Sequence, residues 1–258
     1  MVRIYLLLFF CIYSFFGAII PTQVSASAKT DYEYQLAQYR KNLAEFTQLK
    51  RDYLQNPTLD NQQKSIIVVK QALQARDLSK ASYARFLAEE IQARNTAYVA
   101  LDPILIKLVK ASEFYFAEST KSAEIITPAD LRKFSATYSK NTVIHDRSFF
   151  YGQVGVKVAQ LVRFQIDAKN ILDTIYPKLP TPAPAPLKAR LEDIPGQAEM
   201  INQKIDLLTS KIIPEEEEGP IMGEQYFNKI VENLSDIRQM EARLIDQFID
   251  IDINYAKL

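Results

Sequence analysis

The sequence predicts an all-α protein, an elongated and mostly antiparallel bundle of about six helices with coiled-coil-like seams. Apolar residues recur about every 3.5 residues over long segments, a spacing typical of helices that pack side by side along their length. The chain has 6 Gly in 258 residues, too few for a fold with many tight turns. No two segments form a convincing strand pair, and a lone strand would leave its backbone N–H and C=O groups without partners.

The first two helices are predicted on either side of a turn at residues 56–58. Over residues 31–55 the apolar stripe consists of Tyr32, Leu36, Tyr39, Leu43, Phe46, Leu49 and Tyr53. The sequence Asn-Pro-Thr at 56–58 interrupts this stripe, as Asn and Pro do in turns. A second helical pattern runs from about Leu59 to the mid-nineties. A short loop between two long helices predicts an antiparallel hairpin.

Two further helix starts carry a capping residue followed by proline at the first helical position. One is Asp102-Pro103, and the helix behind it contains three consecutive aromatic residues, Phe114 to Phe116. Because three consecutive residues span most of a helix circumference, we expect this segment to be covered on several sides. The other start is Thr127-Pro128, which we expect to open a short helix that ends near Tyr138.

Residues 142–177 allow two interpretations. From Ala159 onward the apolar spacing is helical, whereas residues 152–158 alternate like a strand. Gly152 and Gly155 each cost a helix about 1 kcal/mol relative to Ala. We favour a helix here, because the chain offers no second strand that could pair with a first one.

The proline-rich segment at 177–186 favours an extended polyproline II conformation. Beyond it, the pattern predicts a helix near 195–213, an acidic loop with Glu215 to Glu218, and a long final helix from about residue 224. We therefore expect a signal peptide at 1–28, a helical bundle at 29–178, a Pro-rich linker or strap at 179–187 and a C-terminal helical hairpin at 188–258. Two helices alone bury little surface, so the hairpin should pack on the bundle or on another chain.

Residues 1–28 have the three parts of a secretory signal peptide. Arg3 supplies the positive charge, residues 4–20 carry none, and Ala26-Ser27-Ala28 forms a small-x-small cleavage motif. We expect cleavage after Ala28 or Ala26 and an extracytoplasmic mature chain; if the segment stays uncleaved, it would be the one membrane contact. Cys11 lies within this leader, so the mature chain would have no thiol and no disulfide.

Little in the composition supports catalysis. Equal numbers of basic and acidic residues, 31 of each, argue against a nucleic-acid partner. His145 is the single histidine, so a triad or a histidine metal site lacks its parts, and we expect it exposed in the first turn of a helix. We treat three further groups as ordinary surface charges: Glu89 with Glu90, Glu113 with Glu118, and Glu215 to Glu218. The sequence therefore predicts no catalytic, metal or cofactor residues and no enzyme activity.

The predicted function is protein–protein interaction, or a structural role in the cell envelope. The apolar seams of the first and last helices need partners, either within the chain or as self-association or binding to another protein. The candidate interaction surface comprises Tyr32, Tyr39, Tyr53, Phe248 and Tyr255. Two alternatives stay open: a pore-forming or membrane-active protein that uses residues 149–162, and a carrier of a small apolar ligand in a cavity lined by Phe114, Tyr115 and Phe116.

Overall fold

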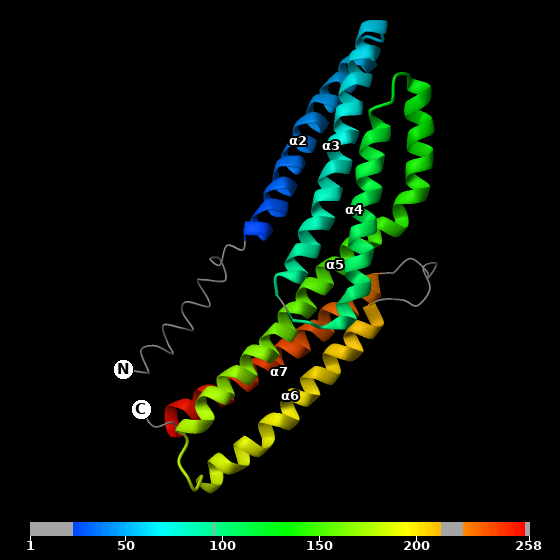
Figure 1. The fold of residues 1–258 in the computed structure, drawn as a ribbon. Helices are drawn as coiled ribbons and strands as arrows, with labels where there is room; N and C mark the ends of the chain where they lie inside the picture. Colours follow the sequence, from blue (N-terminus) through cyan, green and yellow to red (C-terminus); the bar gives the residue numbers. More distant parts are fainter. Residues whose placement is uncertain (1–22, 95, 213–223, 256–258) are drawn as a thin grey trace. The chain divides into compact units, whose positions relative to one another are not determined.

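The computed structural model describes residues 23–94, 96–212 and 224–255, and in these residues the fold is all-α. Six α-helices and two short 3₁₀-helices make up this part of the chain, and no strand occurs in it. Their bounds are α2 Gln23–Gln55, α3 Leu59–Gln92, η1 Val99–Leu101, α4 Asp102–Ser122, α5 Pro128–Ile175, η2 Tyr176–Lys178, α6 Ala185–Ile212 and α7 Glu224–Tyr255 (Figure 1). The predicted fold class is confirmed. Leader residues 1–22 and the acidic run Glu215 to Glu218 lie outside the described residues.

The chain forms two compact units. The first unit, called the N-terminal unit below, holds residues 22–93 and 102–156, which include α2, α3, α4 and the start of α5. Among the described residues, the C-terminal unit holds 94, 96–101, 157–212 and 224–255, with η1, the end of α5, η2, α6 and α7. The boundary between the units thus falls inside α5, between residues 156 and 157, rather than at the proline-rich segment.

Within the N-terminal unit, α2 and α3 form the expected antiparallel hairpin, side by side in Figure 1. The turn at 56–58 ends on Thr58, whose side chain accepts a hydrogen bond from the Asn61 N–H at 3.2 Å and so caps α3. Helix α3 packs against α2 and α4. The buried side of α3 is rich in small residues, which let the neighbouring helices approach closely: Ala72, Ala75, Ala81 and Ala84.

Helix α5 is one helix of 48 residues, so the prediction of a short helix ending near Tyr138 is wrong. No Pro or Gly occurs between residues 139 and 151, and without such a breaker the helix continues. Its start is as predicted: the Asp130 N–H donates to Thr127 Oγ1 at 3.2 Å, and the Thr127 N–H donates to the Asp130 carboxylate at 2.8 Å. These reciprocal bonds form a capping box.

The ambiguous residues 152–158 are helical, as favoured. Their glycines mark close contact between helices rather than a strand. A Cβ on Gly152 would lie 2.8 Å from Leu108 Cδ2 of α4, and a Cβ on Gly155 would lie 3.0 Å from Ile91 Cδ1 of α3. Glycine therefore allows α5 to approach α3 and α4 more closely than any other residue would.

The C-terminal unit contains the clearest helical seam. Buried residues of α6 are spaced by seven and then by three or four: Leu187, Ile194, Ile201, Ile205, Leu208 and Ile212. Helix α7 packs against α6 and buries its own stripe, which comprises Ile230, Ile237, Leu244, Phe248 and Ile251. The stripe predicted for the last helix therefore has its partner inside this unit.

Helix α6 begins at Ala185, earlier than the predicted start near residue 195. Pro186 falls in the first turn, where the missing N–H has no intrahelical acceptor to lose, and the Lys188 N–H already bonds to the Pro184 carbonyl at 2.9 Å. Pro195 lies inside the helix and is tolerated there. Non-helical chain between η2 and α6 is consequently limited to residues 179–184, shorter than the extended segment expected from the alternating prolines.

Candidate functional site

The N-terminal unit contains a group of polar side chains that we call the buried polar cluster. It is formed by residues of three helices: Arg76, Asp77 and Lys80 of α3, Tyr115 of α4, and Tyr138 and Asp146 of α5. Asp77, Tyr115 and Tyr138 are its buried members, whereas Asp146 lies at its exposed edge. The helical spacing of α3 places Arg76, Asp77 and Lys80 within about one turn of each other.

Asp77 is at the centre of the first half of the cluster. Asp77 is 0% exposed. Its carboxylate accepts two hydrogen bonds from Arg76, one from Nε at 2.8 Å and one from Nη2 at 3.1 Å. The Tyr138 hydroxyl donates a third bond to Oδ1 at 2.7 Å. The Arg76 guanidinium also lies over the Tyr138 ring, 3.9 Å from its centroid. A buried carboxylate requires this degree of satisfaction, because an unpaired charge would be costly to bury.

Asp146 is at the centre of the second half. Lys80 Nζ donates to Asp146 Oδ1 at 2.7 Å, and the Tyr115 hydroxyl donates to the same oxygen at 2.6 Å. Lys80 Nζ also lies 4.7 Å from the centroid of the Tyr115 ring and 5.9 Å from that of Tyr138. Lys80 therefore joins the two halves through cation–π contacts.

The electrostatics of the cluster follow from burial. Burial raises the pKa of Asp77, and the hydrogen bonds from Arg76 and Tyr138 oppose this rise. Burial and the bond to Asp146 raise the pKa of Tyr115, while burial and the charge of Asp77 raise that of Tyr138. Both tyrosines therefore stay protonated at neutral pH and act as hydrogen-bond donors.

This arrangement ties three helices of the N-terminal unit together. Each carboxylate accepts hydrogen bonds from a cationic side chain and from a tyrosine hydroxyl of its own unit. The cluster fixes α3, α4 and α5 in one register, since a shift of any of these helices would break a hydrogen bond to Asp77 or Asp146.

His145 directly precedes Asp146 of the cluster on α5, well inside the helix rather than in its first turn as predicted. It is half-buried, and its ring stacks on Phe114 with centroids 4.0 Å apart and an interplanar angle of 13°. Burial lowers its pKa. The expectation of an exposed histidine in a first turn is wrong, because α5 begins at Pro128 and continues past Tyr138, and because the His145 ring stacks on Phe114 of α4.

Helix α4 has a second apolar side that faces outward. Its inner side buries Ile104, Leu108 and Tyr115, while Ile106, Val109 and Phe116 are each more than half exposed. These three recur at spacings of three and seven, so they form one stripe, which we call the outer stripe. The expectation that Phe114 to Phe116 are covered on several sides is wrong for Phe116, which is 56% exposed. The outer stripe is absent from the predicted interaction surface, although its spacing is present in the sequence.

The residues predicted as an interaction surface lie in different environments. Tyr32, Tyr39 and Tyr53 are half-buried on α2, and the Tyr32 ring lies 4.8 Å from that of Tyr83 on α3. Phe248 is 5% exposed within the C-terminal unit, whereas Tyr255 is partly exposed at the end of α7. The structure thus places the aromatic rings of this set against their own unit to different degrees.

Two of the acidic pairs considered in the sequence lie in the described residues. Glu113 is exposed on α4, whereas Glu118 is buried and accepts from Lys121 Nζ at 2.6 Å. Glu89 and Glu90 are adjacent on α3 and half-buried.

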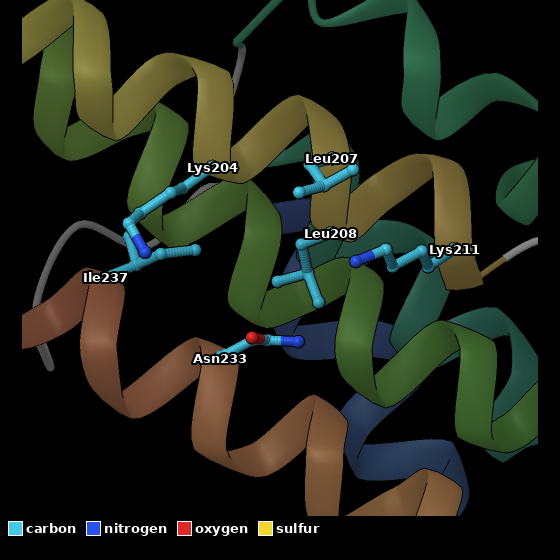
Figure 2. A pocket seen from close by; sticks show the side chains of 6 residues that line it. All are labelled: Lys204, Leu207, Leu208, Lys211, Asn233 and Ile237. Carbon is cyan, nitrogen blue, oxygen red and sulfur yellow. The ribbon is translucent and has the colours of Figure 1, made fainter.

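The C-terminal unit has a small cavity between α6 and α7, with a volume of about 50 Å³. Figure 2 shows its lining, which consists of Lys204, Leu207, Leu208 and Lys211 of α6 and Asn233 and Ile237 of α7. This volume holds a few water molecules and lies far below the roughly 300 Å³ at which small-molecule sites begin.

Among the described residues, no three or more His, Cys, Asp or Glu side chains are grouped to hold a metal ion. In the same residues, no helix combines the length and the apolarity needed to cross a membrane. Comparison with known proteins finds no matching family model, no matching curated protein and no matching solved structure. The class that the described fold defines is therefore an all-α helical protein with a polar cluster in one of its units.

Proposed function

We propose that this chain is an exported, non-catalytic helical protein that binds a protein partner through the outer stripe of α4. The observation that carries this proposal is the two-sided character of α4: one side is buried in the N-terminal unit, and the other exposes Ile106, Val109 and Phe116. Scattered exposed apolar residues are ordinary, but three on one side of one helix are typical of a contact surface. The signal-peptide pattern of residues 1–28 supports export.

The chemistry of the stripe favours an amphipathic helix as the partner. From Ile106 to Phe116 the stripe spans about 15 Å at 1.5 Å per residue, which matches about three turns of a second helix. Lys110 and Glu113 are exposed on the same side, so the rim offers one charge of each sign for orienting the partner. The buried polar cluster supports this function by holding α4 in place.

A binding experiment tests the proposal. Immobilised mature protein is incubated with solubilised envelope proteins, and Phe116→Ser is compared with Met200→Ser, which changes an equally exposed apolar residue on α6. We expect a protein that the wild type and Met200→Ser retain and that Phe116→Ser loses. Circular dichroism first verifies that both variants fold. If retention by Phe116→Ser and by Met200→Ser is the same, the outer stripe does not bind the partner.

The environment of residues 149–162 makes a membrane-active protein the weaker candidate. Tyr151, Val154 and Val158 are already buried in the fold, so this segment would have to leave its packing before it could enter a bilayer. The carrier alternative finds little support in the aromatic residues 114–116, because Tyr115 is buried while Phe116 faces solvent.

A further inference from the structure

The outer stripe of α4 is nearly symmetric about one point along the helix, between Ala111 and Ser112, which we call the midpoint. Ile106 lies five residues before Ala111, and Phe116 lies four residues after Ser112. Both apolar side chains are 56% exposed. A pattern that is nearly the same in both chain directions fits a partner helix that has the same sequence and runs antiparallel to α4.

The charged residues on this side of α4 follow the same symmetry, with opposite signs at the two related positions. Lys110 lies directly before the midpoint region and Glu113 directly after it, and both are exposed. Asp102 in the first turn and Lys121 in the last turn are also equally far from the midpoint. Lys121 already binds Glu118 of its own helix, so the central pair carries the argument.

Resting on the proposed function, in which the outer stripe binds a protein, we propose that the partner is a second copy of this chain. Its α4 packs antiparallel on α4, with a two-fold axis at the midpoint. In this register Ile106 meets Phe116 of the second copy to within about one residue, or about 1.5 Å along the helix. Lys110 lies at the height of Glu113 of the second copy, and the two-fold axis repeats each contact.

The charges also set the direction of the second helix. A parallel pair of α4 helices would bring Lys110 against Lys110 and Glu113 against Glu113, and like charges at an interface are unfavourable. The antiparallel pair brings together opposite charges at both positions. The same surface therefore complements itself in one orientation and repels itself in the other.

The size of the outer stripe sets the strength of the dimer. Stable interfaces use about 20–30 residues from each partner, whereas this one uses about three turns of one helix. We therefore expect a reversible dimer with a Kd on the order of 10–100 µM, rather than a permanent one.

The first test measures the mass of the purified mature protein by sedimentation equilibrium, from about 1 µM to about 1 mM. We expect the mass to rise from that of one copy to that of two. Phe116→Ser should remain a single copy, whereas Met200→Ser, which changes a similarly exposed apolar residue of α6, should dimerise like the wild type. A wild type that stays a single copy up to about 1 mM, or dimerisation of Phe116→Ser equal to that of the wild type, would overturn the inference.

The second test exchanges charges and leaves the apolar stripe intact. Lys110→Glu and Glu113→Lys should each weaken the dimer about tenfold, because each variant places like charges opposite each other at two symmetric positions. The double variant Lys110→Glu/Glu113→Lys should dimerise like the wild type, and circular dichroism verifies that all three variants fold. Unchanged dimers in the single variants, or no recovery in the double variant, would contradict the antiparallel register.

The third test separates this inference from the proposed function. A photoreactive amino acid replaces Val109 in intact cells, and the mass of the cross-linked adduct is measured. We expect an adduct of two copies of this chain. An adduct with a different protein only would overturn the second copy as partner and leave the proposed function standing, whereas the absence of any adduct would overturn both.

Discussion

Asp77 shows at the scale of single residues how this protein buries charge. Three hydrogen bonds satisfy it, two from Arg76 and one from Tyr138, and the Arg76 guanidinium stacks on the same Tyr138 ring. Such contacts make the ion pair worth little against apolar packing but costly to break from one side, since the remaining charge stays buried.

Asp77→Asn should therefore destabilise the protein strongly. We expect the free energy of unfolding to fall by about 3 kcal/mol, because Arg76 loses its buried counter-charge. Chemical denaturation measures this loss. The control is Asp60→Asn, whose exposed pair with Lys64 should contribute less than about 0.5 kcal/mol. Similar losses for both variants would mean that breaking the buried Arg76–Asp77 pair costs no more than breaking an exposed pair.

The buried residue Glu241 should make the stability of the C-terminal unit depend on pH. It is buried on α7, and Gln165 donates to it at 3.3 Å, yet burial raises its pKa to about 8. A pKa raised on folding means that the folded state holds a proton that the unfolded state releases near pH 4.5. The contribution of Glu241 to the free energy of unfolding is therefore fully present below about pH 4.5, and it is lost as the pH rises through about 8.

Glu241→Gln should remove this dependence. The free energy of unfolding of the wild type, measured by chemical denaturation, should fall relative to that of Glu241→Gln between pH 5 and pH 8, by up to about 1.4 kcal/mol per pH unit. Glu232→Gln, on an exposed position of α7, serves as the control and should follow the wild type. A wild-type curve parallel to that of Glu241→Gln would show that Glu241 titrates normally.

At the scale of elements, α5 depends on glycine for its close approach to α3 and α4. The nearest atoms to a Cβ at Gly152 belong to Leu108 and Leu87, both buried, so neither side chain has room to move. Gly196 of α6 offers the matched case, since nothing lies within 4 Å of its Cβ position.

Gly152→Ala and Gly196→Ala should therefore change stability in opposite directions. We expect Gly152→Ala to lower the free energy of unfolding by about 1–2 kcal/mol through overpacking, despite the better helix propensity of Ala. Gly196→Ala should raise it by about 0.5–1 kcal/mol. Thermal unfolding of both variants decides this. Stabilisation by both would mean that α5 is not closely packed at Gly152.

How far the elements could be predicted depends on which physical signal marks them. Apolar periodicity and the Asn-Pro turn located α2 and α3, and Thr127-Pro128 located the start of α5. The start of α6 was predicted too late, because proline is compatible with the first turn of a helix as well as with a linker. The buried polar cluster could not be predicted from the sequence. Asp77 and Asp146 have the pattern of surface charges, and only the fold brings Tyr138 and Tyr115 into contact with them. The outer stripe was visible in its spacing, but the sequence does not say which apolar side of a helix is covered.

At the scale of the whole molecule, the two units have different kinds of interior. The N-terminal unit buries polar groups at the junction of α3, α4 and α5, whereas buried α6 side chains form an almost wholly aliphatic seam. A polar interior specifies one arrangement of helices more strongly than an apolar one, because a shifted helix leaves charges unpaired. This fits our proposal that the N-terminal unit carries the binding surface, since the outer stripe has to be held in one position.

Site-specific photo-cross-linking in intact cells tests the central claim, protein binding by the outer stripe, most directly. A photoreactive amino acid replaces Val109 in the outer stripe or Asp236, an exposed residue of α7, as control. We expect a discrete protein adduct from position 109 and none from position 236. Absence of any adduct at 109, or the same adducts at both positions, would contradict the claim that this surface of α4 binds a partner.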